Sequence, residues 1–200
     1  MKHLLAVAAT GTAFLAAPLA AQDINFSYGG AANAALYSGG QDYTIEAYLE
    51  ASANGFFGGI WAATIDGGPD DFEFELYAGY ATTLENLDIA LTLTAYFLED
   101  VYDSTDLELA LGYPVTEAVT LTSAAAYNFD YESWDISVGT EITPMEPLTL
   151  AALVGDDGTG TYWEASASYA LNKVAYVKIL YEDNSYGGPE TVTLSVGFDF

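Results

Sequence analysis

The chain has very few basic residues and no cysteine. Its 200 residues include 29 Asp and Glu, 3 Lys and Arg, one His and no Cys. Without cysteine there are no disulfides, thiolate nucleophiles or thiolate metal ligands, and the scarcity of histidine removes the usual general base. Nucleic acids and anionic lipid surfaces are disfavoured as partners, because both require a basic surface. The sequence therefore predicts no catalytic residues, no cofactor and no metal site.

Residues 1–21 have the layout of a secretory signal peptide. A short basic start is followed by a largely apolar stretch, and small residues precede Gln22. We expect cleavage after Ala21, which leaves a mature chain of residues 22–200 with two bases, Lys173 and Lys178. Beyond this segment no stretch approaches the roughly 20 continuous apolar residues of a membrane helix. If the mature chain enters a membrane, it must therefore do so as a β-barrel.

The acidic residues are expected to belong to an ordered structure rather than to a disordered chain. Disordered acidic chains have low hydrophobicity, whereas 52% of these residues are hydrophobic and 16 are Tyr. The mature sequence instead reads as short segments with alternating apolar and polar residues, which is the pattern of half-buried strands. Asn54-Gly55 after one such segment is a strong hairpin signal. We predict about twelve strands, in the segments 26–37, 42–52, 57–65, 72–80, 87–97, 106–113, 119–129, 134–142, 148–154, 163–171, 174–181 and 191–200.

The connections between these segments alternate in length. Tight turns are predicted at residues 54–55, 84–86, 114–116, 144–146 and 172–173, and longer acidic loops at 66–71, 99–106, 130–135, 156–157 and 182–190. Short turns at one end and longer loops at the other are typical of a bacterial outer-membrane barrel. An even strand number then puts both ends of the chain on the periplasmic side. We predict an all-β fold, a single antiparallel up-and-down transmembrane barrel.

Aromatic residues are expected at both ends of the apolar faces. One predicted girdle comprises Tyr43, Phe72, Phe97, Phe129, Trp134, Trp163 and Tyr181, and the other comprises Phe57, Tyr80, Tyr113, Tyr169, Phe198 and Phe200. For the segment 57–65, the apolar face is predicted to carry Phe57, Gly59, Trp61, Ala63 and Ile65. Two aromatic girdles around an aliphatic band suit the two lipid interfaces. The alternative is a soluble β-sandwich or lipocalin-like barrel with these faces as its core.

The last strand resembles a membrane-insertion signal. Apolar residues of 191–200 alternate with polar ones up to Phe198 and Phe200. A terminal Phe on such a strand is similar to the signal by which outer-membrane barrels are recognised for insertion. The resemblance implies the lipid bilayer of the outer membrane and the barrel-assembly machinery as partners.

A second resemblance concerns the segment Gly55-Phe56-Phe57-Gly58-Gly59-Ile60-Trp61 and the later Leu76-Tyr77-Ala78-Gly79-Tyr80. This sequence resembles the TorF-like family of small proteobacterial porins, and the similarity extends along the mature chain. The resemblance implies an outer-membrane barrel that acts as a channel, without catalytic residues. An Arg-containing segment expected in the first strand of this family is missing here.

The polar faces of the predicted strands carry carboxylates. We predict that one set of residues lines a lumen: Glu46, Glu50, Glu73, Glu75, Asp88, Glu108, Glu141, Glu164, Lys178 and Asp199. Ionised carboxylates in such number are very costly in a dry interior, so the lumen should contain water. A negatively lined pore favours cations, which predicts small cationic or neutral solutes. The alternative is that the acids form the solvated surface of a protein from a saline habitat.

Two further motifs favour other interpretations. Residues 155–160 have the oxygen ligands and glycines of a Ca²⁺-binding turn but lack the full spacing of a calcium loop, so an acidic hairpin is the simpler reading. Glu73 and Glu75 could act as an acid and base pair, but carboxylates two residues apart on a strand share one lumen face.

Twelve strands lie between filled barrels of about eight strands and open ones of 16 to 18. A non-conducting structural or adhesive barrel is therefore the main rival to a porin, followed by a soluble barrel that binds apolar ligands.

Overall fold

The structure, a computed structural model, describes residues 24–65, 71–99 and 101–200. The predicted signal peptide lies outside these residues. The described residues form twelve strands: β1 (Asn25–Tyr37), β2 (Gly40–Ala53), β3 (Phe56–Thr64), β4 (Phe72–Leu84), β5 (Leu87–Leu98), β6 (Val101–Thr116), β7 (Val119–Asn128), β8 (Ser133–Met145), β9 (Leu148–Asp156), β10 (Thr161–Ala170), β11 (Ala175–Asn184) and β12 (Thr191–Asp199). No helix among them is long and apolar enough to span a membrane.

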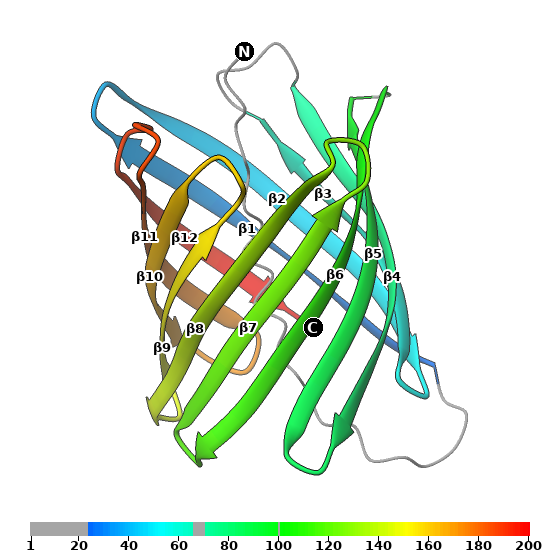
Figure 1. Ribbon diagram of the computed structural model, residues 1–200. Helices are drawn as coiled ribbons and strands as arrows, with labels where there is room; N and C mark the ends of the chain where they lie inside the picture. Colours follow the sequence, from blue (N-terminus) through cyan, green and yellow to red (C-terminus); the bar gives the residue numbers. More distant parts are fainter. Residues whose placement is uncertain (1–23, 66–70, 100) are drawn as a thin grey trace.

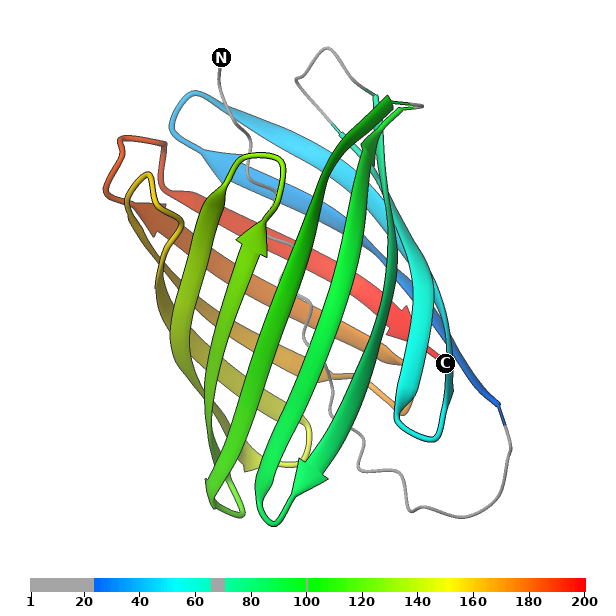
Figure 2. The same ribbon diagram turned by 45° about the vertical axis from the view of Figure 1, so that its right-hand side comes forward.

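The strands form one closed antiparallel barrel. Each strand pairs with its neighbours in the chain, and β1 pairs with β12 from Gly29 opposite Asp199 to Tyr37 opposite Thr191. The strands are steeply tilted around the barrel, as Figures 1 and 2 show from two sides. Closure removes the unpaired edges that an open sheet would present. The predicted all-β architecture with about twelve strands is confirmed.

The two ends of the barrel differ in their connections. Residues 54–55, 85–86, 117–118 and 146–147 form two-residue turns at one end, which we call the turn end. Asn54 and Gly55 both have positive φ, of 54° and 84°, as a type I′ hairpin turn requires. The other end, which we call the loop end, carries longer connections at residues 129–132, 157–160 and 185–190. The predicted asymmetry is present in part. At the loop end, residues 38–39 form a short turn and β6 begins at Val101 soon after β5 ends at Leu98, whereas the connection at residues 171–174 of the turn end is four residues long. The predicted turn at 114–116 is wrong, because β6 continues to Thr116.

The predicted loop at residues 99–106 is wrong. β6 already begins at Val101, and its pairing with β5 continues through this segment after a register shift. Tyr96 pairs with Ser104 and Phe97 with Tyr102, so Asp103 is an extra residue on β6. Such a bulge bends a strand without ending it. The polar composition of the segment therefore reflects the rim of the barrel rather than a long loop.

Register assigns every residue to the inner or the outer face, because directly paired residues share a face. On β2, Glu46 pairs with Ala31 and Ala63, both of which are buried, whereas the neighbouring Ile45 is 66% exposed. The exposed face is consistently apolar around the barrel. It carries Leu49, Ile60, Leu76, Leu91, Leu93, Leu109, Leu121, Val138, Leu150, Ile179 and Leu194. This surface suits contact with lipid rather than with water.

The predicted facing of β3 is wrong. Phe57, Gly59, Trp61 and Ala63 pair with Ser52, Glu50, Tyr48 and Glu46 of β2, so they point inward. Phe56 and Ile60 point outward instead, and Phe56 is 65% exposed. β3 is apolar on both faces, so its alternation did not identify the lipid side. Phe56 replaces Phe57 in the aromatic girdle at the turn end.

The other predicted girdle residues lie on the outer face. Tyr43, Phe72, Phe129, Trp134 and Trp163 are exposed near the loop end, and Tyr80, Tyr113, Tyr169, Phe198 and Phe200 are exposed near the turn end. Several of these rings stack on neighbours. Phe74 and Phe97 lie parallel with ring centroids 4.6 Å apart, and Phe56 contacts Tyr80 at 4.8 Å. Aromatic residues at both ends of an aliphatic band match the two interfaces of a membrane.

Candidate pore lining

All ten residues predicted to line a lumen lie on the inner face. Their pairings link strand to strand: Glu46 and Glu50 on β2, Glu73 and Glu75 on β4, Asp88 on β5, Glu108 on β6, Glu141 on β8, Glu164 on β10, Lys178 on β11 and Asp199 on β12. The closed register therefore places them around one interior. Whether ions follow them is a separate question of function.

The carboxylates are concentrated on one part of the inner wall. Glu75 is 6% exposed, and the charges that act on it most strongly are those of Glu73, Asp106 and Glu46. On the adjoining wall, Glu108 is repelled by Asp135 and Asp106. Oδ1 of Asp106 is buried and has no hydrogen-bond partner among the described residues. Carboxyl groups of β2, β4 and β6 therefore lie within electrostatic range of one another on this wall.

Asp106, Asp135 and Glu182 are among the inner-face acids that were absent from the predicted lining. Asp106 pairs with Thr94 and Asn128, Asp135 pairs with Ala126, and Glu182 pairs with Glu164. Asp106 and Asp135 lay at the starts of the predicted segments 106–113 and 134–142, where predicted loops overlapped them, and Glu182 lay in the predicted loop 182–190 because β11 was predicted to end too early. The alternation of Asp106 with Leu107 and Leu109 was a usable signal for the first of them.

Lys178 is the only basic side chain on the inner wall of the described strands. It acts electrostatically on Glu46, Glu164 and Glu182. It pairs with Ser195 of β12 and Ser168 of β10, which places it on the wall next to the barrel closure. One ammonium group therefore lies within electrostatic range of at least three carboxyl groups on this part of the wall.

Tyrosine hydroxyls hold several of these carboxylates. Tyr48 donates to Asp199 at 3.1 Å, Tyr37 to Asp42 at 3.0 Å and Tyr162 to Asp135 at 2.8 Å. Tyr77 makes a similar side-chain hydrogen bond to Glu50. Such charge-assisted bonds fix both partners, since the tyrosine is oriented and the carboxylate is held against the wall. The aromatic and acidic side chains of the interior thus form one network.

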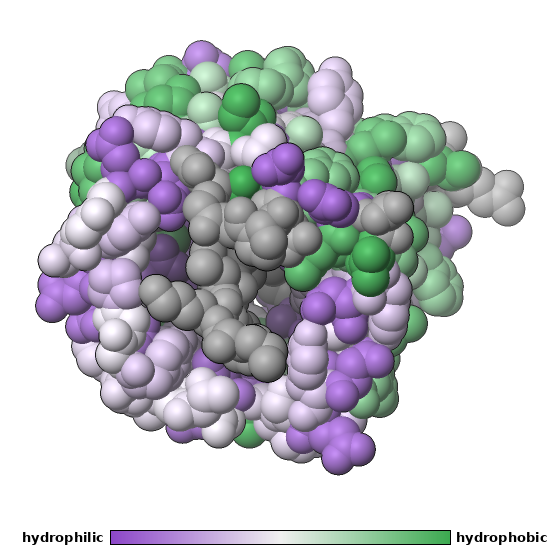
Figure 3. Space-filling model, turned by 90° about the horizontal axis from the view of Figure 1, so that it is seen from above, coloured by the Kyte–Doolittle hydropathy of each residue, from purple (hydrophilic) through white to green (hydrophobic). Residues whose placement is uncertain are grey.

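The rim at the loop end is acidic and internally hydrogen-bonded. Figure 3 looks onto this end and shows hydrophilic residues around it. Tyr102 donates to Asp130 at 2.6 Å, and Tyr131 donates to Asp103 at 2.8 Å. The second bond, together with partial burial, raises the pKa of Tyr131 to about 12. These contacts tie the beginning of β6 to the β7–β8 loop.

The acidic turn between β9 and β10 uses its carboxylates internally. Oδ1 of Asp156 accepts from the amide of Gly158 at 2.9 Å. Oδ1 of Asp157 accepts from the amide and hydroxyl of Thr159 and from the amide of Gly160. No group of three His, Cys, Asp or Glu side chains in the described part of the chain could hold a metal ion. The acidic hairpin is the arrangement that the structure contains.

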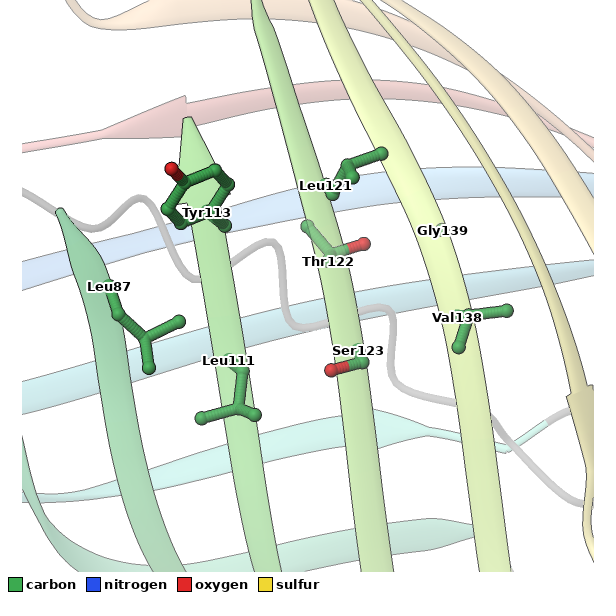
Figure 4. Close-up of a pocket in the computed structure, with 8 residues that line it drawn as sticks. All are labelled: Leu87, Leu111, Tyr113, Leu121, Thr122, Ser123, Val138 and Gly139. Atoms are coloured by element: carbon green, nitrogen blue, oxygen red, sulfur yellow. The ribbon is translucent and has the colours of Figure 1, made fainter. Parts of the chain in front are cut away.

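A shallow hollow of about 300 Å³ lies on the outer wall near the turn end. Figure 4 shows its side chains, which come from β5, β6, β7 and β8 and include Leu87, Leu111, Leu121 and Val138. All four belong to the outward register, and the small Ser123 between them leaves the space. The hollow is therefore part of the apolar outer surface of the barrel.

The described strands form a closed twelve-stranded antiparallel barrel with an apolar outer face. No protein-family model and no characterised protein matches the sequence. Solved structures are similar to it. The KdgM porin has a TM-score of 0.72 at 12% identity, covering 86% of this chain and 99% of KdgM. The NanC porin has a TM-score of 0.62 at 11% identity, covering 86% and 98%. For a triple mutant of Rhodopseudomonas blastica porin the TM-score is 0.55 at 10% identity, covering 89% and 100%. At these identities the likeness concerns the fold alone.

Proposed function

We propose that this protein is an outer-membrane porin through which small cationic or neutral solutes diffuse passively, without catalysis. The observation that carries the proposal is the closed barrel with an apolar outside and an inner wall of carboxylates. Ionised carboxylates on the inner wall require water or cations nearby, because their transfer to a dry interior is very costly. Rings of Asp and Glu select cations in channels. Both arguments point to a hydrated lumen with a preference for positive charge.

The charge of the inner wall also bears on which solutes the pore would admit. KdgM was solved in complex with disordered oligogalacturonate, which is a polyanion. An inner wall with many carboxylates and one lysine repels such a ligand. We therefore propose that this chain uses the same barrel for solutes of the opposite sign or of none.

The test is ion conduction in planar bilayers. The wild-type protein is expected to conduct and, under a salt gradient, to show a reversal potential that favours cations. Replacing Glu46, Glu73, Glu75 and Glu108 with Gln should lower the ratio of cation to anion permeability several-fold, because negative charge on the inner wall is lost. Glu117→Gln and Glu146→Gln at the turn end serve as controls and should leave the ratio nearly unchanged. A folded protein without conductance would favour a structural or adhesive barrel.

The proposed location has its own test. This location is supported by the predicted signal peptide, the predicted insertion signal at Phe198 and Phe200 and the resemblance to the TorF-like porins, which together imply delivery to the bacterial outer membrane by the barrel-assembly machinery. The protein should fractionate with outer membranes and need detergent for extraction. On gels, the unheated sample should migrate differently from the boiled one. Release into the aqueous fraction without detergent would instead support a soluble barrel that binds apolar ligands.

A further inference from the structure

Five glycines on the inner wall each lie directly opposite an aromatic residue of a neighbouring strand. The pairs are Gly29 with Tyr48, Gly59 with Tyr77, Gly79 with Phe57, Gly155 with Tyr162 and Gly197 with Tyr176. In every pair, a Cβ added to the glycine would come within 3.0 Å of the partner's ring. The ring thus occupies the space that a side chain would need.

In three of the pairs, those of Tyr48, Tyr77 and Tyr162, the hydroxyl of the ring reaches a carboxylate on the next strand. Tyr48 starts on β2, crosses Gly29 of β1 and donates to Asp199 of β12. Tyr77 of β4 crosses Gly59 of β3 and bonds Glu50 of β2 in the same way. Each ring therefore lies along the wall across its glycine, with its polar end fixed two strands away.

The same arrangement recurs on the other side of the barrel. Tyr162 of β10 crosses Gly155 of β9 and donates to Asp135 of β8 at 2.8 Å. Tyr162 is only 8% exposed although it belongs to the inner face. Tyr176 of β11 lies over Gly197 of β12, close to the charges of Asp199 and Glu46. These rings are bulky enough to obstruct a twelve-stranded lumen if they stood upright.

We propose that the inner-face glycines set the bore of the pore by letting aromatic rings lie along the wall instead of across the lumen. This inference rests on the proposed porin function, since only an open lumen has a bore to set. A glycine within a strand weakens the strand, because it has no side chain to pack. Its presence at these positions is explained by the close approach of the aromatic ring. Gly112 differs, because an added Cβ there would meet nothing closer than 3.6 Å.

Gly155 and Gly197 give the sharpest test. The three atoms nearest to an added Cβ all belong to the partner ring, whereas at Gly59 and Gly79 backbone oxygens are equally close. In Gly155→Ala the ring of Tyr162 must therefore leave the wall, and the lumen is the free direction. We expect about a twofold loss of single-channel conductance, because a lumen of this size leaves little room for a ring. The largest polyethylene glycol that enters the pore should also become smaller.

A double variant distinguishes a narrower pore from a disturbed fold as the cause of lost conductance. In Gly155→Ala with Tyr162→Ala the ring is gone, so conductance should return at least to the wild-type value. Tyr162→Ala alone should conduct as well as or better than wild type, and it tests the same ring if Gly155→Ala does not fold. Gly112→Ala is the matched inner-face control and should conduct normally. The migration of unheated samples reports folding throughout.

The outcomes are distinct. A wild-type protein that conducts, with Gly155→Ala conducting equally well, would overturn the role of the glycines and leave the porin function standing. The same holds if the double variant keeps the loss, because the effect would then be backbone strain rather than the ring. A wild-type protein that does not conduct would overturn both proposals.

Discussion

Asp157 fixes the β9–β10 loop through a single carboxylate oxygen. Its Oδ1 accepts from the amide of Thr159 at 2.8 Å, from the Thr159 hydroxyl at 2.6 Å and from the amide of Gly160 at 3.1 Å. Desolvation would raise the pKa of this carboxyl, but the hydrogen bonds outweigh it and the pKa is lowered below its ordinary value. A group with a lowered pKa in the folded state stabilises that state only while it is ionised. The loop is therefore stabilised at neutral pH, and this contribution disappears in acid as the pH falls through the folded pKa.

Amide hydrogen exchange in detergent micelles can measure this effect residue by residue. The amides of Thr159 and Gly160 should be protected at neutral pH and lose protection in acid. Asp157→Ala should abolish their protection at every pH, at a cost of about 1 to 3 kcal/mol for the hydrogen bonds lost to a charged group. Asp156→Ala is the control and should affect mainly the amide of Gly158. Normal protection in Asp157→Ala would contradict the role of this carboxylate.

At the scale of a strand, adjacent residues of β5 face opposite sides of the barrel wall, one toward lipid and the next toward the lumen. Leu93 is 48% exposed on the outer face, whereas Thr92 pairs with Gly79 and Glu108 on the inner face. Leu93→Arg should lower the free energy of unfolding by about 2 to 4 kcal/mol, as expected for Arg on the lipid face near the bilayer centre. Thr92→Arg should cost much less and should reduce cation preference. Denaturant titrations in lipid vesicles measure both variants, and equal costs would contradict the assignment of the faces.

The closure between β1 and β12 depends on Phe200. Its amide donates to the carbonyl of Tyr28 at 2.8 Å, its carbonyl accepts from Tyr28 at 3.1 Å, and the two rings stack with centroids 5.1 Å apart. Phe200→Ala removes the ring stacking but keeps the backbone bonds. We expect a smaller folded fraction after a fixed time of refolding into vesicles, measured by the migration of unheated samples. Leu194→Ala, which truncates another outward residue of β12, is the control and should have the smaller effect.

Strands with one polar face could be oriented from the sequence, and β3 could not. On β4, Glu73 and Glu75 alternate with Phe72 and Phe74, so one face is marked for water. β3 carries Phe56 and Ile60 on one face and Phe57 and Trp61 on the other, so both faces look apolar. A shift of one residue exchanges the faces of a strand, and here the Asn54-Gly55 turn and the pairing with β2 decide which face is inside.

The strand ends at the loop end were predicted too short for a related reason. Acidic residues such as Asp103, Asp135 and Glu182 look like loop residues when the sequence is read locally. In a barrel with a hydrated interior, however, the inner face tolerates carboxylates up to the rim. The pairs of glycine and aromatic residues could not be predicted from the sequence either. They lie on neighbouring strands, and no local sequence pattern specifies the register that places them opposite each other. The candidate lining followed from alternation, whereas its aromatic network required the closed barrel.

At the scale of the whole molecule, the inner face of the described strands carries many carboxyl side chains and a single lysine, Lys178. Lys178 acts on Glu46, Glu164 and Glu182, so it reduces the negative potential along its part of the wall. Lys178→Gln should therefore raise the ratio of cation to anion permeability. Lys173→Gln removes the same charge from the turn between β10 and β11, outside the wall, and should have little effect.

Salt provides the decisive comparison for these two lysines. The electrostatic screening length falls from about 10 Å at 0.1 M salt to about 3 Å at 1 M. At 1 M salt, a charge on the wall therefore has little effect on an ion farther away in the lumen. The difference between Lys178→Gln and wild type should therefore be largest in reversal potentials measured at low salt and should shrink at high salt. An effect of Lys178→Gln that is independent of salt would mean that the lysine acts by occupying space. An equal effect of Lys173→Gln would mean that net charge, rather than charge on the inner wall, governs selectivity.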